Sequence, residues 1–186
     1  TINRNPWADK PNDQVFRVSL DGQTWKLEGL PKGDKGALAW SPDGKWIAVG
    51  NVGGDSVTVI DAAKLEVVKT LTGLALPIRT FFTSDGVHML VACANSGELA
   101  VFDTKTLTEK KRIKLANAKG VTLTQGPFPM PMNFEADRKN GRIYSVLINA
   151  DAVAVIDEKS LEVVGILATG SFPDGIGFTP FVMPNS

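Results

Sequence analysis

The chain has 186 residues, and its 20 Lys and Arg side chains balance its 20 Asp and Glu side chains, which argues against a nucleic-acid partner because phosphate attracts a positive field. No apolar run approaches the roughly 18–20 residues of a membrane-spanning helix, so no membrane span is predicted. One cysteine, Cys93, excludes an intrachain disulfide, and a hydrophobic fraction of 43% fits one globular domain.

The first thirty residues predict part of a β-sheet rather than a complete one. The stretch "QVFRVSLDGQTWKLEGL" (14–30) predicts two antiparallel strands. Before it, "TINRN" (1–5) predicts the end of another strand, and the enlarged loop that follows contains Trp7. Residues 1–30 therefore predict the last three strands, b to d, of a four-stranded unit.

The next forty residues predict a complete unit over residues 36–73. Two strands in "ALAWSPDGKWIAVGN" (37–51) meet at an Asp-Gly hairpin turn, where Gly supplies the positive φ that such turns need. Two further strands in "VTVIDAAKLEVVKTL" (57–71) show the period-two alternation of a sheet. They meet at a polar turn headed by Asp61, whose short carboxylate can accept backbone N–H groups.

The same unit recurs twice more, over residues 77–115 and 130–169. Its turn aspartate stands at Asp103 and again at Asp157, 42 and then a further 54 residues along the chain. The extra dozen residues lie in "ANAKGVTLTQGPFPMPM" (116–132), between strand d of one unit and strand a of the next. Three prolines stiffen this loop.

The chain ends with what resembles a new beginning. "SFPDGIGFTP" (171–180) predicts a turn followed by a first strand, so residues 172–186 predict strand a of a composite unit that residues 1–30 complete. Ile176–Thr179 is expected to pair beside Thr1–Arg4, in the same molecule or in a neighbour. Such closure removes exposed sheet edges.

Four short strands repeated every ~40–50 residues are typical of β-propeller blades. The sequence therefore predicts an all-β fold, a single β-propeller module over residues 1–186 with four-stranded antiparallel blades. Three complete blades and one composite blade are visible, about four in all. The alternatives are a partial ring, a small closed ring of four blades, and two copies that form an eight-bladed homodimer.

The repeat "SPDGKWIAVGN…VTVIDAAKLEVVKTL", its two copies and "FPDGIGFTP" resemble the YVTN-type β-propeller repeat family, which is related to cytochrome d1-like and amine dehydrogenase-like propellers. The resemblance implies a ring of seven or eight blades, so a partial ring with missing blades elsewhere is favoured. It also implies a periplasmic or extracellular protein.

Residues that could carry catalysis are scarce, and no catalytic residue and no metal site are predicted. His88 is the single histidine, and it aligns with Trp46 and Ile143 in the sister repeats, which favours a packing role. Neither a nucleophile elbow, a Cys-x-x-Cys-His haem attachment motif nor a zinc-type cluster is present. Cys93 is interpreted as a small buried hydrophobe.

Binding residues are predicted in the irregular connections between blades, since function concentrates in loops on a rigid scaffold. The d-to-a connections are expected to surround the mouth of the channel on one face, while the b-to-c loop with Trp7 is expected on the opposite face as an anchor for a partner. The long loop could equally pack over its own blades. The candidates for a ligand or partner site are Lys35, Arg79, Phe128, Met130, Met132, Asp174 and Trp7.

These features favour an extracytoplasmic binding or scaffold module over an enzyme. The module is expected to recognise a protein partner or small ligand without a cofactor of its own. The alternative is the propeller portion of a periplasmic redox enzyme, haem d1-like or quinoprotein dehydrogenase-like, with a haem-type or quinone cofactor on a partner. That alternative would need histidines on the channel face. A lactonase-like or lyase-like site would need acidic or histidine ligands that converge on the channel.

Overall fold

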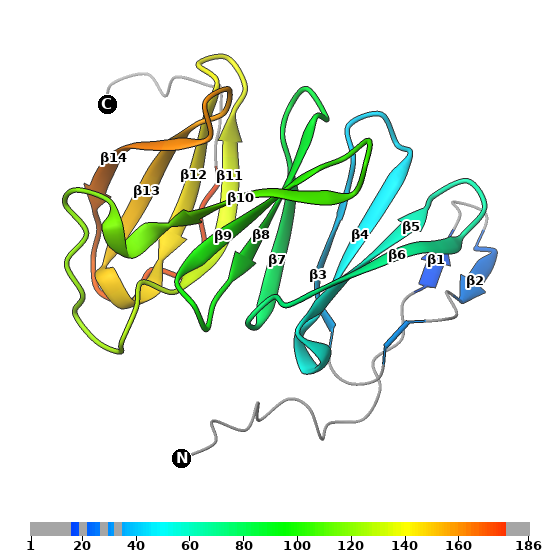
Figure 1. The fold of residues 1–186 in the computed structure, drawn as a ribbon, viewed down its shortest axis with the longest axis horizontal. Coiled ribbons are helices and arrows are strands. Elements are labelled where there is room, and N and C mark those ends of the chain that lie inside the picture. The colour runs from blue at the N-terminus through cyan, green and yellow to red at the C-terminus, as the bar shows by residue number, and fades with distance from the viewer. Residues whose placement is uncertain (1–15, 19–21, 27–29, 32–34, 178–186) are drawn as a thin grey trace.

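The computed structural model describes residues 16–18, 22–26, 30–31 and 35–177, and it is built almost wholly of short β-strands (Figure 1). Within these residues the helices are three 3-10 turns of three residues each, so none is long enough to cross a membrane. The elements are β1 (Phe16–Val18), β2 (Thr24–Lys26), β3 (Lys35–Trp40), β4 (Trp46–Asn51), η1 (Val52–Gly54), β5 (Ser56–Asp61), β6 (Glu66–Thr72), β7 (Pro77–Phe82), β8 (His88–Cys93), β9 (Glu98–Asp103), β10 (Thr108–Lys114), η2 (Leu115–Asn117), β11 (Pro131–Asp137), β12 (Arg142–Leu147), η3 (Ile148–Ala150), β13 (Ala152–Asp157) and β14 (Glu162–Ala168).

Three antiparallel sheets contain four strands each, in chain order from one edge to the other. We call β3–β6 blade 1, β7–β10 blade 2 and β11–β14 blade 3. Their first strands, β3, β7 and β11, contact one another in turn, and the blades fan out side by side from them (Figure 1). The predicted all-β propeller fold with four-stranded antiparallel blades is confirmed. The pair β1–β2 forms a two-stranded sheet before blade 1.

The turn aspartates act as the repeat predicts. Asp61 Oδ1 accepts the N–H groups of Ala63 (3.0 Å) and Lys64 (2.9 Å), which ties the turn between strands c and d. The backbone bond from Lys64 lowers the pKa of Asp61. Asp103 makes the equivalent bonds to Lys105 and Thr106.

The strand register corrects one alignment of the repeats. Arg142 pairs with Asp157, as Trp46 pairs with Asp61 and His88 with Asp103. The residue equivalent to His88 in blade 3 is therefore Arg142, and the alignment of His88 with Ile143 is wrong. The cause is the third hairpin, in which β12 begins one residue after the turn glycine instead of two.

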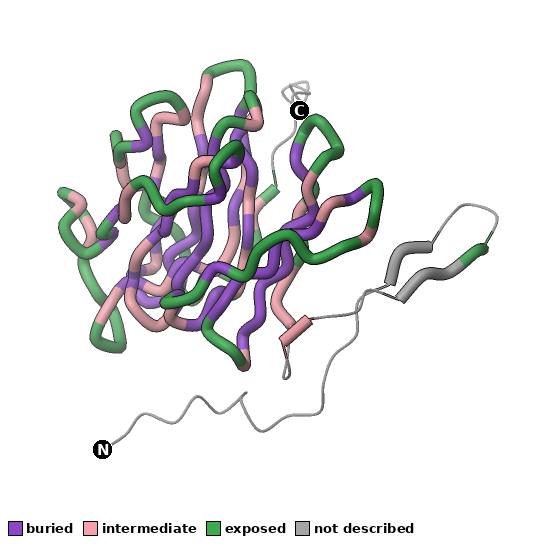
Figure 2. Tube along the Cα trace, turned by 45° about the vertical axis from the view of Figure 1, so that its right-hand side comes forward, coloured by how far each residue is buried: buried purple, intermediate pink, exposed green. Residues whose placement is uncertain are grey.

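The cores lie between neighbouring blades, because alternate residues of each inner strand face alternate neighbours. Figure 2 shows the buried residues concentrated along the strands of the fan. Between blades 1 and 2 the core includes Ala48, Val57, Val59, Leu71, Phe82, Met89, Val91 and Phe102. Between blades 2 and 3 it includes Leu90, Leu99, Val101, Ile113, Phe134, Ile143, Leu147 and Ile156.

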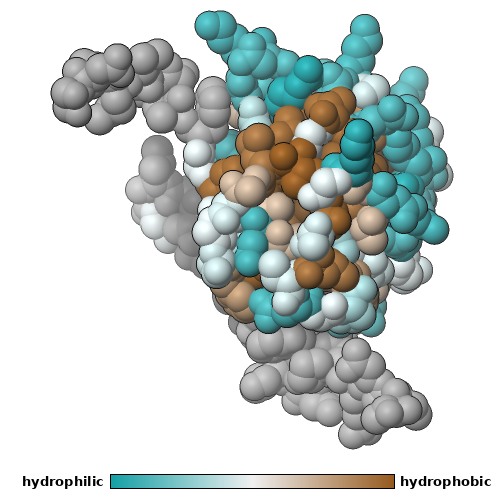
Figure 3. Space-filling view, turned by 90° about the vertical axis from the view of Figure 1, so that its left-hand side faces the viewer, coloured by the Kyte–Doolittle hydropathy of each residue, from teal (hydrophilic) through white to brown (hydrophobic). Residues whose placement is uncertain are grey.

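One repeat position shows how burial depends on the neighbouring blade. Leu71 in blade 1 is 5% exposed and its equivalent Ile113 in blade 2 is 6% exposed, yet Leu167 in blade 3 is 52% exposed. Seen from the side of blade 3, apolar side chains gather on the surface (Figure 3). Leu167 thus has the chemistry of a core residue without a blade packed over it.

Truncation of these equivalent residues should therefore have unequal effects on stability. Ile113→Ala should lower the free energy of unfolding by about 2–4 kcal/mol, since it leaves a cavity between two blades. Leu167→Ala should lower it by less than about 1 kcal/mol, because half of the side chain already contacts water. Urea unfolding of both variants measures the difference. Equal losses would show that the joint between blades 2 and 3 contributes little.

Candidate binding face of the propeller

The connections from strand b to c and from strand d to a lie together at one end of the blades, which we call the loop face. Leu74 N–H donates to Asp55 O (3.1 Å), and Thr169 N–H donates to Asp151 O (2.9 Å). Antiparallel strands reverse direction each time, so alternate connections must share an end. The expectation that a b-to-c loop lies opposite the d-to-a loops is therefore wrong for these blades. Trp7 itself lies outside the described residues.

Two aspartates in left-handed conformation organise this face. Asp55 (φ 45°) accepts the Leu76 N–H at Oδ1 (3.0 Å), and Asp151 (φ 46°) accepts the Phe172 N–H at Oδ1 (2.9 Å). The two donor residues also share positive φ angles, 54° at Leu76 and 59° at Phe172, and each precedes a proline. The same arrangement, an aspartate that accepts the N–H of a positive-φ residue before a proline, therefore lies at the exit from blade 3 and at the connection from blade 1 to β7.

Blade 2 has Gly97 where the other blades have aspartate, and the long loop explains the difference. Gly97 has a φ of 66°, and a side chain there would meet Phe128 Cβ at 2.9 Å and Pro129 O at 3.0 Å. The absence of a side chain leaves room for the 116–131 loop to cross this position. The insertion and the glycine are therefore one structural feature.

The long loop is tied to blade 3 along its second half. Thr124 N–H donates to Asn149 O (2.8 Å), and the buried Asn149 side chain donates from Nδ2 to Phe128 O (3.3 Å). Ile148 N–H donates to Met130 O (3.1 Å). These bonds fix the backbone at Thr124, Phe128 and Met130, while residues 122–127 remain exposed to solvent.

The predicted site residues take different places on or near this face. Met130 packs against Val52, Leu76 and Ala94, so its side chain joins loops of two blades. Lys35 Nζ donates to Pro31 O (2.7 Å), and Arg79 Nη1 donates to Ile78 O (3.1 Å). Phe128, Met130, Met132, Lys35 and Arg79 are half-buried, and Asp174 is exposed. The sequence reasoning missed Asn149, Asp55 and Asp151, which organise the loops.

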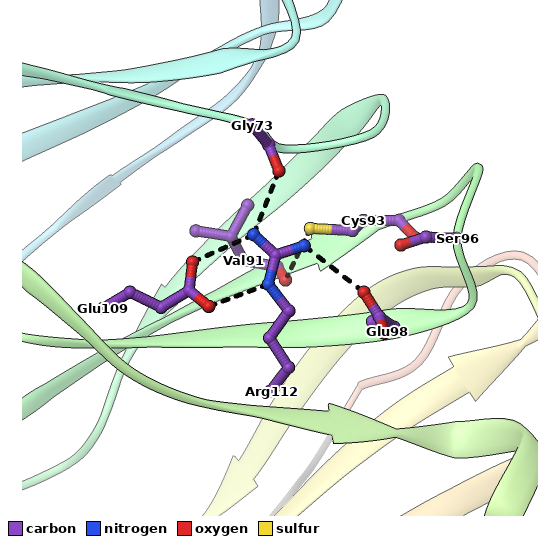
Figure 4. A network of polar contacts seen from close by, with 7 residues as sticks. All are labelled: Gly73, Val91, Cys93, Ser96, Glu98, Glu109 and Arg112. Carbon is purple, nitrogen blue, oxygen red and sulfur yellow. Dashed lines mark hydrogen bonds and ion pairs between the residues drawn. The ribbon is translucent and has the colours of Figure 1, made fainter.

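Figure 4 shows a polar network that links blade 2 to blade 1. Arg112 binds both carboxylate oxygens of Glu109 (2.8 and 2.9 Å), and it also reaches Glu98 (3.3 Å) and Gly73 O (3.0 Å) at the end of β6. Bonding to Glu109 raises the pKa of Arg112, which stays charged. Burial raises the pKa of the nearby Cys93 thiol to about 11, so the thiol stays protonated and inert. Arg112 therefore acts as a clamp between blades.

His88 lies at the other end of β8, away from the loop face. Its Nε2 is 3.0 Å from Lys110 Nζ, an arrangement in which the neutral imidazole accepts from the ammonium. Burial first, and then the Lys110 charge, lower the pKa of His88 against the opposing effect of Asp85 and Asp103. The environment favours the neutral ring.

A haem with an imidazole axial ligand does not fit the described part of the loop face. The one imidazole is held by Lys110 at the opposite end of the strand, and the one thiol is buried and protonated. Among residues 16–18, 22–26, 30–31 and 35–177, no group of three or more His, Cys, Asp or Glu side chains could hold a metal ion.

Comparisons with known proteins agree with this fold. The family model for the Cytochrome D1 heme domain matches residues 42–126. Kuenenia stuttgartiensis hydrazine synthase is 25% identical, with a TM-score of 0.62, over 73% of this chain and 36% of that chain. The dihydro-heme d1 dehydrogenase NirN is 20% identical, with a TM-score of 0.62, over 78% of this chain and 30% of that chain. A virginiamycin B lyase from Staphylococcus aureus, solved with quinupristin, is 12% identical, with a TM-score of 0.68, over 85% of this chain and 49% of that chain.

These findings define the class of protein as an all-β propeller with four-stranded blades. The chain spans about a third of the length of the hydrazine synthase and NirN chains. The relation to cytochrome d1-like propellers, expected from the repeat, is confirmed by the family match and these neighbours. A search of curated proteins gave no significant match.

The lowered pKa of His88 predicts a pH-dependent stability. A depressed native pKa means that the unfolded chain, with a pKa near 6.5, binds the proton more readily. Stability should be full above about pH 6.5 and fall as the pH drops through the native pKa. Unfolding midpoints at several pH values from 5 to 8 measure this slope.

His88→Gln should remove this part of the pH dependence, and Lys110→Met should reduce it by removing the facing positive charge. If the slope between pH 5 and 7 were the same in wild type and His88→Gln, the imidazole would not be the titrating group.

Proposed function

We propose that this propeller is a binding or scaffold module that recognises a protein partner or small ligand at the loop face. The observation that carries the proposal is the 116–131 loop, which is fixed by Asn149 and Ile148 at its base and exposed at residues 122–127. A loop that is ordered before binding loses little conformational entropy when a partner docks.

The exposed part of the loop has the composition of a recognition surface. Residues 122–127 read Thr-Leu-Thr-Gln-Gly-Pro and carry no charge. Leu123 offers an apolar contact and Gln125 offers an amide that can both donate and accept hydrogen bonds. The exposed carboxylate of Asp174, on the segment that leaves blade 3, adds a charged group among the d-to-a connections.

We also propose an extracytoplasmic location, periplasmic or extracellular, on the basis of the resemblance to periplasmic and surface-exposed propellers. Fractionation of the source cells tests it. Recovery of the protein with cytoplasmic markers after release of the periplasm would contradict this location.

A second candidate is the propeller portion of a redox enzyme that holds a haem-type or quinone cofactor on a partner. The match to the Cytochrome D1 heme domain and the likeness to NirN favour it. Against it stands the position of His88, which bonds Lys110 away from the loop face. Purification of the protein from its source together with any bound partner, followed by a visible absorption spectrum, distinguishes the two functions: the redox candidate should give a Soret or quinone band in the complex, and the binding module should give none.

Substitution within the exposed loop should weaken partner binding without loss of stability. The variant Leu123→Asp with Gln125→Ala should reduce capture of a partner from a periplasmic extract at least about tenfold, because it replaces the apolar and amide contacts. The thermal midpoint should stay unchanged, since both side chains are exposed.

The matched control is Val164→Asp, which places the same charge on an exposed position of β14 outside the loop face. Capture should be measured by biolayer interferometry with equal amounts of each immobilised variant. Equal capture by the loop variant and by the control would refute the role of the loop.

A further inference from the structure

The joints between blades 1 and 2 and between blades 2 and 3 show what a complete contact between blades looks like, and blade 3 lacks such a contact on its outer side. We call the face of a blade toward the next blade in the chain its leading face, and the opposite face its trailing face. On the leading face of blade 3, Leu167 is exposed and borders a hollow of about 330 Å³. The hollow is lined by Glu135, Tyr144, Val153, Leu167, Ala168, Thr169, Ile176 and Gly177.

The trailing face of blade 1 is open only near the innermost strand. Leu38 and Trp40 on β3 are 46% and 49% exposed, whereas their equivalents in blade 2, Thr80 and Phe82, are both 7% exposed. Farther out on the same face, Ile47, Val49, Ile60 and Ala62 are buried and Leu30 packs against them. Inner strands are therefore missing over β3, while the outer part of the face is covered.

The chain itself supplies the beginning of such an inner strand. Phe172 and Pro173 repeat the geometry with which Leu76 and Pro77 lead into β7. By this equivalence Ile176 corresponds to Thr80, which faces blade 1 and donates to Ala48 O (3.3 Å). Ile176 likewise faces blade 3, where it lines the hollow.

The next residue points to what the strand should cover. Gly177 corresponds to Phe81, whose ring packs against Phe134 of β11 with the ring centroids 5.7 Å apart. The residue equivalent to Phe134 in blade 1 is Leu38, because these residues pair with Ser145 and Val49 at the same register position. Gly177 should therefore face a Leu38.

That Leu38 does not come from the same chain. Blades 1 and 3 stand at opposite ends of the fan, with the segment after β14 beside blade 3 (Figure 1). We propose that a second copy of this chain docks head to tail. The segment Phe172–Gly177 of each copy then supplies the beginning of the inner strand over Leu38 and Trp40 of its partner. The two equal seams close one ring with two-fold symmetry.

The composition of the open faces supports a contact between separate chains. Phe81 and Leu90 of the internal joint are replaced by Glu135 and Tyr144 on the leading face of blade 3. Contacts between separately folded chains are more polar than a domain core.

A disulfide across the proposed seam tests the arrangement. Leu38→Cys and Gly177→Cys are combined with Cys93→Ala, and a side chain at Gly177 meets no atom within 4 Å. Oxidation should give a cross-linked species of twice the 19.9 kDa chain mass, and light scattering should give the same doubled mass. An internal disulfide at single-chain mass would show closure within one chain and overturn the proposal. So would a single-chain mass without cross-linking, or a doubled mass without this disulfide.

Charge substitutions give an independent measure. Trp40→Glu and Leu167→Glu should each weaken self-association at least about tenfold, because each places a carboxylate in the seam. Val87→Glu is the control, because Val87 is 46% exposed and lies in the hairpin between β7 and β8 of the central blade, away from both ends of the fan. Circular dichroism confirms folding, and Leu167→Glu decides the outcome if Trp40→Glu fails to fold. Association unchanged in Leu167→Glu would overturn the proposal.

Discussion

The structure depends on the packing of each blade against two neighbours at once. Because strand residues alternate between faces, Leu90 and Val91 are adjacent in sequence but belong to different joints. Both faces of β8 are buried, so all six of its residues lie inside. A blade at either end of the fan has only one such joint, and its other face exposes side chains that belong in a core. The exposure of Leu167 and Trp40 is a consequence of this rule.

The strands and their order could be predicted because the turns repeat. Asp61 and its two equivalents mark the turn between strands c and d, and the Asp-Gly or Asn-Gly pairs mark the hairpins. The register of blade 3 could not be predicted in the same way. Its hairpin has one residue fewer between the turn glycine and the next strand. An alignment on the glycine therefore places Ile143 opposite His88, although the ladder shows that Arg142 is the equivalent residue. Local sequence signals predict that a strand exists, but only the observed pairing of the strands shows which residues lie opposite each other.

The candidate site was only partly predictable for a similar reason. The irregular spacing of the repeats reveals the 116–131 loop, and with it Phe128 and Met130. The loop's anchor, Asn149, lies some twenty residues away along the chain and carries no motif. Gly97 could have been found by comparison with Asp55 and Asp151 at the same repeat position, since a lost carboxylate there signals that another segment takes its place. Contacts between distant loops are set by packing, which periodicity does not record.

These features bear on function through one distinction, between residues that hold blades together and residues that face outward. Arg112 and His88 are residue types that often act in catalysis, but here Arg112 is bound by Glu109 and His88 by Lys110, all within blade 2. The loop face differs, because Asp55 and Asp151 bond backbone groups there, and Asn149 holds the 116–131 loop, whose residues 122–127 are exposed. The scaffold interactions fix where this segment stands, and the proposed recognition rests on its exposed, uncharged side chains.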